Sequence, residues 1–359
     1  MNGSFLHRIT GSIMAIVFLF SSIFLITCKD DDDNDNLYPV IFTGPVTGVS
    51  SAGAVFQGLF NGRDISKIDD HGFVWDTKDN PELGSTNFKS LGSSAKEKFS
   101  AEISFALETN KTYYVRAFYK MGKTIFYGHS VSFASLGSKA PVITALEPEK
   151  ASWGDTISVI GENFSFRIAD LSVRFGPHTA NLVSASDTFL RAVVPQQLDT
   201  IYSGVSVNLF GNQAFSVQKF SLLPPEIYNV SLVEAYFKSE IVITGKHFKK
   251  DYTRVYFDDK EATQIEINPD RIICRIPFYE KSTEVSLKVE VISQEDKFSQ
   301  KIRVLVPEIT RLSAYEGTWR DTITIYGENF PTITSDIKIL FDNEPLGPLF
   351  GSRIALLLK

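Results

Sequence analysis

The side chains that most often carry chemistry are spread along this sequence without forming a recognisable site. No two histidines have the spacing of a metal-binding motif, and the five of them are His7, His71, His129, His178 and His247. The sequence also lacks the Gly-x-Ser-x-Gly nucleophile turn, a phosphate-binding loop and the dinucleotide-binding glycines. Paired carboxylates such as Asp258 and Asp259 follow an expected strand, where solvated turn residues are common. The sequence therefore predicts a protein that is not an enzyme and that holds no metal and no cofactor.

One cysteine, Cys28, stands at the boundary between an apolar run and an acidic run. The apolar run covers residues 13–26 and is interrupted by two serines, and Arg8 supplies a positive charge before it. A charged start, a short apolar core and a small residue before the cut are typical of a secretory signal peptide. The apolar core is about half of the roughly 20 residues that a membrane-spanning helix needs. A signal peptide over residues 1–27 is therefore favoured over a permanent transmembrane anchor.

The Leu-Ile-Thr-Cys junction that ends at Cys28 resembles the lipobox of bacterial lipoproteins, in which the cysteine is acylated and becomes the mature N-terminus. The residues that follow resemble the export signal of surface-exposed lipoproteins in the Bacteroidetes, and they are Lys29, Asp30, Asp31, Asp32 and Asp33. These resemblances imply lipid attachment at Cys28, an acidic tether over 28–37, and an outer-membrane location facing the cell exterior. Other interpretations stay open: a cleaved signal peptide with a chance cysteine, an uncleaved signal anchor, and calcium binding by the aspartates.

Composition sets the size and the partners of the mature chain. About 320 residues follow the tether, which predicts two to four domains. The net charge is −6 and the basic residues are scattered, so nucleic acid is not expected as a partner. The aromatic share of 13% favours strands. The second cysteine, Cys274, lies in an alternating run over 271–276 and is expected to face a core, where a thiol is inert.

A pattern that recurs three times decides the expected fold of the C-terminal part of the chain. Each copy opens on a proline followed by an apolar residue, and a glycine comes 20 residues later at the end of an alternating run. A phenylalanine follows that glycine by three positions. The opening prolines, the glycines and the phenylalanines are Pro141, Pro225 and Pro307, then Gly161, Gly245 and Gly327, then Phe164, Phe248 and Phe330. The alternation predicts a half-buried strand, and the glycine is expected to permit a bend or bulge in it.

The Pro-x-Ile opening and the Gly-x-Asn-Phe strand end resemble the IPT/TIG family of immunoglobulin-like domains. Copies one and three read Gly-Glu-Asn-Phe, whereas copy two departs to Gly-Lys-His-Phe. The resemblance implies a small antiparallel sandwich for each copy, joined by short proline linkers into a semi-rigid stalk. We name the copies repeat 1 (140–222), repeat 2 (223–305) and repeat 3 (306–359). Repeat 3 is expected to be incomplete, because the residues that would supply its last strands are missing.

Residues 38–136, named here the first domain, lack this repeat. The run Leu107-x4-Thr112-Tyr-Tyr-Val-Arg-Ala resembles the corner and F strand of fibronectin type III domains. In that fold an aromatic at the strand entry is tied back to the preceding turn, and Trp75 becomes the core tryptophan of the C strand. The expected fold class is therefore all-β, with tandem immunoglobulin-like β-sandwiches after an N-terminal lipoprotein signal peptide.

Three aromatic residues share one position, 12 residues after each opening proline, and they are Trp153, Phe237 and Trp319. Exposed rings in a row could stack on sugars, but packing of each ring against its own sandwich is favoured. The overall hypothesis is a non-catalytic cell-surface lipoprotein that binds extracellular glycan or a protein partner. Two alternatives stay open: the modules are the spacer of a longer protein with a lost enzyme or β-propeller domain, or the protein is an adhesin.

Overall fold

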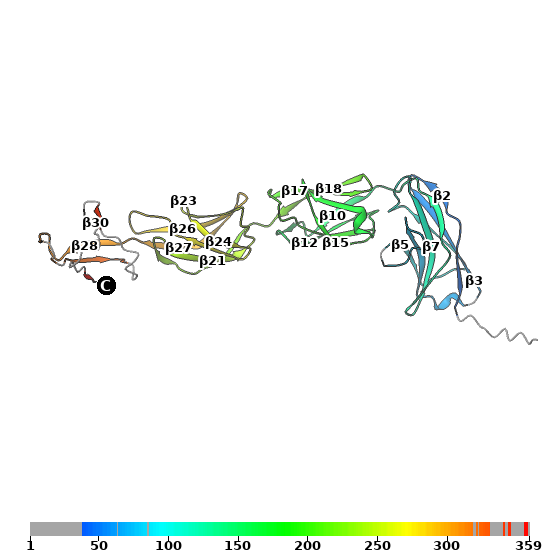
Figure 1. The fold of residues 1–359 in the computed structure, drawn as a ribbon, viewed down its shortest axis with the longest axis horizontal. Helices are drawn as coiled ribbons and strands as arrows, with labels where there is room; N and C mark the ends of the chain where they lie inside the picture. The colour runs from blue at the N-terminus through cyan, green and yellow to red at the C-terminus, as the bar shows by residue number, and fades with distance from the viewer. Residues whose placement is uncertain are drawn as a thin grey trace, which may run out of the picture.

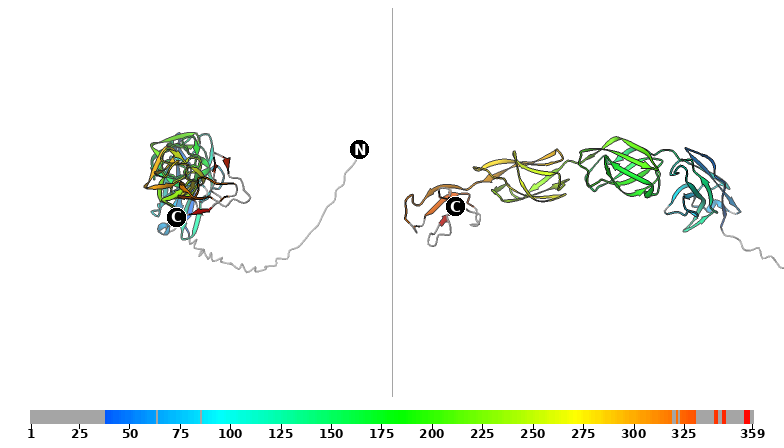
Figure 2. Two further views of the ribbon diagram at one scale, coloured as in Figure 1. Left: turned by 90° about the vertical axis from the view of Figure 1, so that its left-hand side faces the viewer. Right: turned by 45° about the horizontal axis from the view of Figure 1, so that its top comes forward.

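The computed structural model describes residues 38–62, 64–84, 86–318, 321 and 323–330, with the backbone of three short strands at 340–341, 344–345 and 355–357. This part of the chain consists of β-strands and two 3-10 turns, without an α-helix. The first domain and repeats 1 to 3 lie end to end in a row (Figures 1 and 2). The all-β, tandem-sandwich fold class is confirmed. Residues 1–37, with the expected signal peptide, Cys28 and the tether, lie outside the described residues.

The first domain is a sandwich of two sheets. In one sheet β3 is paired with β1 and β2 on one side and with β6 on the other. The second sheet has the order β5-β4-β7-β8, with β9 also paired to β7. The strands are β1 (Val40–Thr43), β2 (Thr47–Ser50), β3 (Gly53–Asn61), β4 (Asp70–Asp76), β5 (Asn87–Gly92), β6 (Lys98–Ile103), β7 (Thr112–Met121), β8 (Thr124–Tyr127) and β9 (Val131–Ala134). A 3-10 turn, η1 (Ile65–Lys67), follows β3.

Aromatic rings fill the core of the first domain. Trp75 is fully buried, packs edge-on against Phe56 and Phe105, and donates its indole N–H to the carbonyl of Ala106. The Tyr113 hydroxyl accepts a hydrogen bond of 2.9 Å from the backbone N–H of Glu108 in the preceding turn. The expected core tryptophan and the expected tie between strand entry and turn are therefore both present.

Repeat 1 has the same two-layer construction with a different strand order. Its four-stranded sheet runs β10-β12-β16-β15 and its five-stranded sheet runs β11-β18-β17-β13-β14. The strands are β10 (Val142–Glu147), β11 (Lys150–Ala151), β12 (Thr156–Glu162), β13 (Leu171–Phe175), β14 (His178–Thr179), β15 (Asn181–Ala185), β16 (Phe189–Val193), β17 (Tyr202–Leu209) and β18 (Asn212–Leu222). The 3-10 turn η2 (Ile168–Asp170) precedes β13.

Repeat 2 reproduces this topology strand for strand. Its sheets run β19-β21-β25-β24 and β20-β27-β26-β22-β23. The strands are β19 (Glu226–Val230), β20 (Glu234–Tyr236), β21 (Glu240–Lys246), β22 (Thr253–Phe257), β23 (Lys260–Glu261), β24 (Thr263–Asn268), β25 (Arg271–Arg275), β26 (Thr283–Val291) and β27 (Gln294–Leu305). Cys274 on β25 is fully buried in the core of this repeat, as its alternating run predicted.

The glycine of the repeated motif is required by close approach, and a bulge lies directly opposite it. A Cβ on Gly161 would stand 1.9 Å from the carbonyl oxygen of Val142 and 2.5 Å from the Phe164 ring. The bulge is in the partner strand β10, between Ile143 and Ala145. The expected bulge is therefore present at this glycine, with the extra residue on β10, and the physical reason for glycine is the space taken by the partner backbone and the buried ring.

The residue before the motif phenylalanine adopts a left-handed backbone conformation in all three repeats. Its φ is 61° at Asn163, 62° at His247 and 60° at Asn329. Asparagine and histidine are among the few side chains that enter this region readily, because short polar groups form local hydrogen bonds there. The change from Asn to His in repeat 2 therefore preserves the backbone geometry of the motif.

Repeat 3 is described only in part. β28 (Glu308–Leu312) and β29 (Thr324–Glu328) pair as in the other repeats, with a register shift between Ile309 and Arg311. On the other side of β29, the short strand β32 (Ala355–Leu357) pairs in parallel. Repeats 1 and 2 have the antiparallel strands β16 and β25 at that position. Two further short strands, β30 (Leu340–Phe341) and β31 (Glu344–Pro345), form a separate pair.

Candidate functional sites at the domain junctions and on the outer faces

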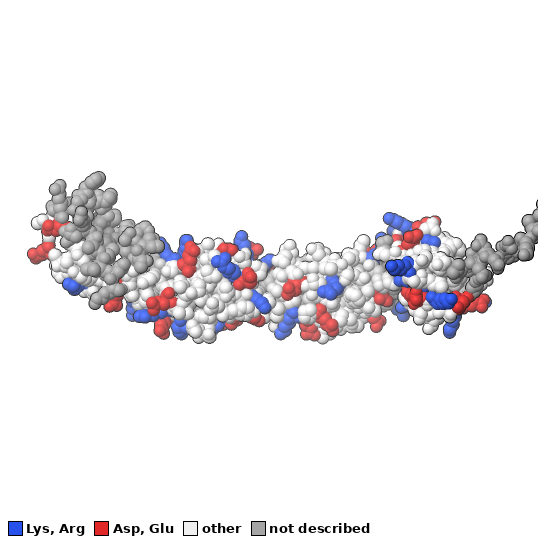
Figure 3. All heavy atoms as spheres, turned by 90° about the horizontal axis from the view of Figure 1, so that it is seen from below, with Lys and Arg blue, Asp and Glu red and all other residues white. Residues whose placement is uncertain are grey.

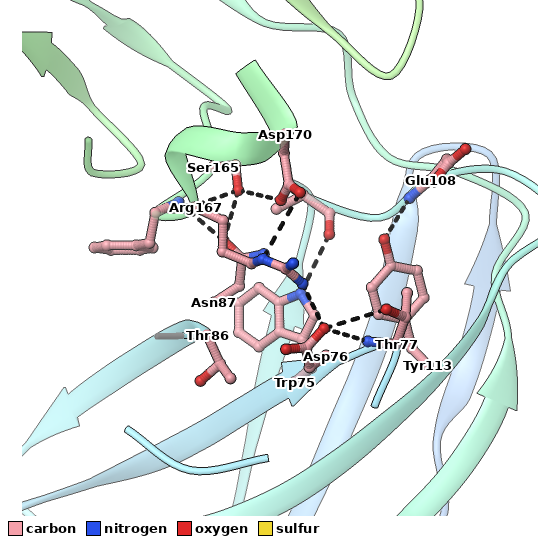
Figure 4. Close-up of polar contacts among 12 residues, drawn as sticks. Trp75, Asp76, Thr77, Thr86, Asn87, Glu108, Tyr113, Ser165, Arg167 and Asp170 are labelled. Atoms are coloured by element: carbon pink, nitrogen blue, oxygen red, sulfur yellow. Dashed lines mark hydrogen bonds and ion pairs between the residues drawn. The ribbon is translucent and has the colours of Figure 1, made fainter. Parts of the chain in front are cut away.

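The junction between the first domain and repeat 1 is built around the loop that follows the motif phenylalanine of repeat 1. Asn87, at the start of β5, is buried, and its side-chain oxygen accepts hydrogen bonds from the Ser165 hydroxyl at 3.0 Å and the Phe166 backbone N–H at 2.9 Å. The Phe166 ring packs against Phe88 with centroids 4.4 Å apart. Figure 4 shows Asn87 of the first domain and Ser165 of repeat 1 converging at this junction.

A charged group completes this junction. The Arg167 guanidinium donates to the carboxylate of Asp76, the last residue of β4, and also lies 3.7 Å from Asp170 on its own loop. Asp76 accepts a second hydrogen bond from the backbone N–H of Thr77. A paired and largely buried carboxylate of this kind fixes geometry, because separating the two partners leaves a charge without compensation.

The junction between repeats 1 and 2 uses the corresponding loop of repeat 2. Tyr252, which follows Phe248 by four positions, lies nearly parallel to the Trp153 ring at a centroid distance of 6.3 Å. Lys249 on the same loop donates to the side-chain oxygen of Gln196 at 2.6 Å. Ile292, in the turn between β26 and β27, packs against the core of repeat 1. In both junctions, therefore, the loop after the motif phenylalanine docks each repeat onto the domain before it.

The aromatic residues predicted from the sequence are not gathered into one site. Trp153 is half-buried, donates its indole N–H to the Leu198 carbonyl at 2.8 Å, and packs against the cores of both repeats 1 and 2. Phe237 is 38% exposed and meets Phe278 edge-on at 5.4 Å. Trp319, like Cys28 and Lys29 to Asp33, lies outside the described residues. Trp153 packs against its own sandwich, as favoured above, and it also contacts the next repeat.

The residues that could bind a metal do not gather into a site within the described ranges. No group of three or more His, Cys, Asp and Glu residues there could hold a metal ion. Burial raises the pKa of the Cys274 thiol to about 12, which keeps it protonated and unreactive at neutral pH. Between residues 38 and 357, with the gaps given above, no helix is long and apolar enough to cross a membrane.

The outer face of the five-stranded sheet of repeat 1 exposes large apolar side chains that the sequence pattern did not single out. Tyr202 on β17 is 64% exposed, Phe215 on β18 is 67% exposed and Val217 is 97% exposed. Phe215 pairs with Ser206, four residues beyond Tyr202 on the neighbouring strand. Four residues of extended strand span about 13 Å. The two rings therefore stand about 13 Å apart along the strand direction. Between them lie Gly204, where an added Cβ would meet nothing within 4 Å, and a shift in the register of β17 and β18.

Repeat 2 shows the same backbone with a charged face. The register of β26 and β27 places Glu284 at the position of Tyr202 and Lys297 at the position of Phe215. Lys297 lies 3.2 Å from Glu295, and Glu295 lies 3.3 Å from Lys288. The surface of the row otherwise carries both signs of charge, interspersed along the face shown in Figure 3. The apolar face of repeat 1 can therefore be recognised because the matched positions of repeat 2 are charged.

Comparison with known proteins agrees with this architecture. The IPT/TIG domain model matches residues 141–222 and 225–303. Repeats 1 and 2 are tandem IPT/TIG domains of immunoglobulin-like fold. Human Fibrocystin-L is 22% identical over 215 residues, which cover 59% of this chain and 5% of the human protein. The chain thus spans only a small part of that curated relative.

Two solved bacterial proteins are similar at low identity. The surface glycan-binding protein PbSGBP-B from Prevotella bryantii is 15% identical, with a TM-score of 0.29, over 46% of this chain and 42% of that protein. A Bacteroides ovatus SGBP-B from a mixed-linkage glucan utilization locus, solved with a heptasaccharide, is 12% identical with a TM-score of 0.22. That match covers 78% of this chain and 74% of the other.

Proposed function

We propose that this chain is a non-catalytic lipoprotein of the outer membrane that faces the cell exterior and binds polysaccharide through the outer face of repeat 1. Membrane attachment is assigned to lipid on Cys28, and surface export to the acidic run after Lys29, because of their resemblance to lipoprotein signals. The contacts between the first domain and repeat 1, and those between repeats 1 and 2, support a row of domains in which repeat 1 is held away from the anchored end.

The observation that carries the binding function is the apolar face of Tyr202, Phe215 and Val217. Exposed apolar groups gathered on one face of a folded domain mark interaction sites, since water is displaced from them favourably on binding. Tyrosine and phenylalanine present flat rings, and tyrosine adds a hydroxyl for hydrogen bonds. Two rings about 13 Å apart along the strand direction suit an extended chain of sugar rings.

Affinity electrophoresis of the full chain against a panel of neutral polysaccharides tests this function. We expect retardation by at least one polysaccharide, and loss of it when Tyr202→Ala and Phe215→Ala are combined. The matched control is Tyr228→Ala, which removes a ring that is 54% exposed in repeat 2. If no polysaccharide retards the chain, or if retardation survives the double substitution, this face is not the binding site.

Metabolic labelling with palmitate tests the anchor separately. The wild-type chain is expected to incorporate label and the Cys28→Ala variant to lose it. Continued labelling of that variant would overturn the assignment of the lipid to Cys28, without bearing on polysaccharide binding.

A further inference from the structure

A cleft in the first domain has no role in the junctions or in the apolar face of repeat 1. It has a volume of about 760 Å³ and is lined by residues of β3, β6 and the connection between β5 and β6. This volume falls in the range of small-ligand sites, which is about 300–1,000 Å³. Among the residues that meet there are Gln57, Ser94, Lys96, Lys98 and Ser100.

The charge of the lining has one sign. Lys96 and Lys98 both contribute to it, and no aspartate or glutamate is among the residues that line the cleft. Glu97, between the two lysines, is exposed and does not belong to the lining. Both lysines are exposed, and Glu102 on the same face of β6 pairs with the lining residue Val55. Within the lining itself the charges are positive, which favours an anionic ligand at a concave surface.

The register of β3 and β6 orders the remaining groups. Gln57 pairs with Ser100, and Leu59 pairs with Lys98, so a polar pair and an apolar–cationic pair stand side by side on the sheet. Directly opposite residues have Cβ atoms about 5 Å apart. The Gln57 side-chain N–H₂ donates to the Thr47 hydroxyl at 2.9 Å, which fixes the amide and leaves its oxygen as an acceptor.

A buried histidine adds a second fixed polar group. His71 is 2% exposed and lines the cleft. Its Nδ1 lies 2.7 Å from the carbonyl oxygen of Gly92. A carbonyl only accepts hydrogen bonds, so Nδ1 carries a proton in this contact and the ring is held in place.

We propose that this cleft binds an anionic saccharide, a sugar that carries a carboxylate or sulfate group. The ammonium groups of Lys96 and Lys98 recognise the anion, while Gln57 and Ser100 recognise ring hydroxyls. Val55 and Leu59 give the partly apolar surface that a sugar ring covers. The inference extends the proposed polysaccharide-binding function to a second site, in a different domain and for a different class of glycan.

Isothermal titration of the full chain with an oligogalacturonide, a sulfated oligosaccharide and a neutral oligosaccharide of equal length tests the proposal. Binding of at least one anionic probe is expected, weakened roughly tenfold or more by combining Lys96→Gln with Lys98→Gln. The matched control combines Lys123→Gln with Lys139→Gln, which removes the same charge from one exposed position of the first domain and one of the linker that follows it. Equal weakening by the control pair, or binding of no anionic probe, would overturn the proposal.

The two proposals fail independently. The Tyr202→Ala and Phe215→Ala pair is expected to leave the affinity for the anionic probe unchanged, because those rings lie in repeat 1. If that pair weakened binding of the anionic probe and the lysine pair did not, the cleft would be the wrong site. If neutral polysaccharides fail to bind while the anionic probe binds, only the face of repeat 1 is refuted.

Discussion

Replacing Arg167 with alanine is expected to open the junction between the first domain and repeat 1 while both stay folded. The guanidinium joins the two domains through Asp76, which lies 91 residues away in the sequence. The other contacts across the junction, including the hydrogen bond from the Phe166 N–H to Asn87, use groups that this substitution leaves in place. The substitution therefore removes one interdomain interaction and no core side chain.

The size of the effect follows from the burial of the two partners. The side chain of Asp76 is 10% exposed and that of Arg167 is 29% exposed. Removing one partner of a fully buried pair costs about 3–5 kcal/mol, because the other charge is left without compensation. Water reaches the Arg167 side of this pair, so we expect about 1.5–2 kcal/mol, close to the cost of a lost hydrogen bond to a charged group. That corresponds to a roughly tenfold to thirtyfold larger open population.

Limited trypsin digestion of the full chain measures that population. Lys139 lies in the linker, is exposed, and donates its backbone N–H to the Ser104 carbonyl at 2.9 Å. We expect opening of the junction to loosen this linker, because the linker joins the two domains that separate. Cleavage after Lys139 should rise in proportion to the open population when opening and closing are fast.

The control variant for this assay is Arg254→Ala. It removes an arginine that pairs with Glu261 at 3.6 Å inside repeat 2, and it should leave cleavage after Lys139 unchanged. Small-angle scattering should show a wider range of interdomain angles for Arg167→Ala only. A change in cleavage of less than twofold, with both domains folded, would refute the assigned role of the ion pair.

Two further predictions concern the repeats themselves. Asn163→Ala should lower the free energy of unfolding of repeat 1 by about 1–2 kcal/mol in urea titrations, because φ at this position is 61° and alanine enters that region at a cost. His247→Asn should leave repeat 2 at least as stable, and an unchanged midpoint for Asn163→Ala would contradict the reasoning. Burial raises the pKa of Cys274 from 9.0 to about 12, so a thiol reagent at pH 8 should label it only when repeat 2 unfolds. The unfolded thiol ionises near pH 9 while the folded one stays protonated, so stability should fall as pH rises above 9. Rapid labelling of Cys274 in the native chain would refute the prediction that this thiol is buried and protonated.

The strands of the repeats could be predicted because their signal is local. Residues alternate between the two faces of a strand, so the run around Cys274 placed that thiol in a core before any partner strand was known. The alternating pattern did not show why residue 161 must be glycine, because the requirement comes from the Val142 backbone and the Phe164 ring. Val142 reaches the glycine through the pairing of two strands, and the Phe164 ring reaches it because the chain folds back after the strand. An alternating pattern encodes neither contact.

The candidate sites depended on contacts that the sequence pattern does not show. Trp153 shares its repeat position with Phe237 and Trp319, and that regularity indicated a common role without saying what each ring meets. The structure places Trp153 at a junction with Tyr252, more than one full repeat further along the chain. Tyr202 and Phe215 became a single surface only when the register of β17 and β18 brought them onto one face.

By itself the sequence determined the all-β class, the repeats and the burial of Cys274, because strand alternation and repeated motifs are written in neighbouring residues. The tertiary structure decided how the domains meet and which surfaces are left open. Asp76 and Arg167 pair because the end of one sandwich docks onto a loop of the next. That docking depends on the shapes of two completed folds, and so no local pattern specifies it.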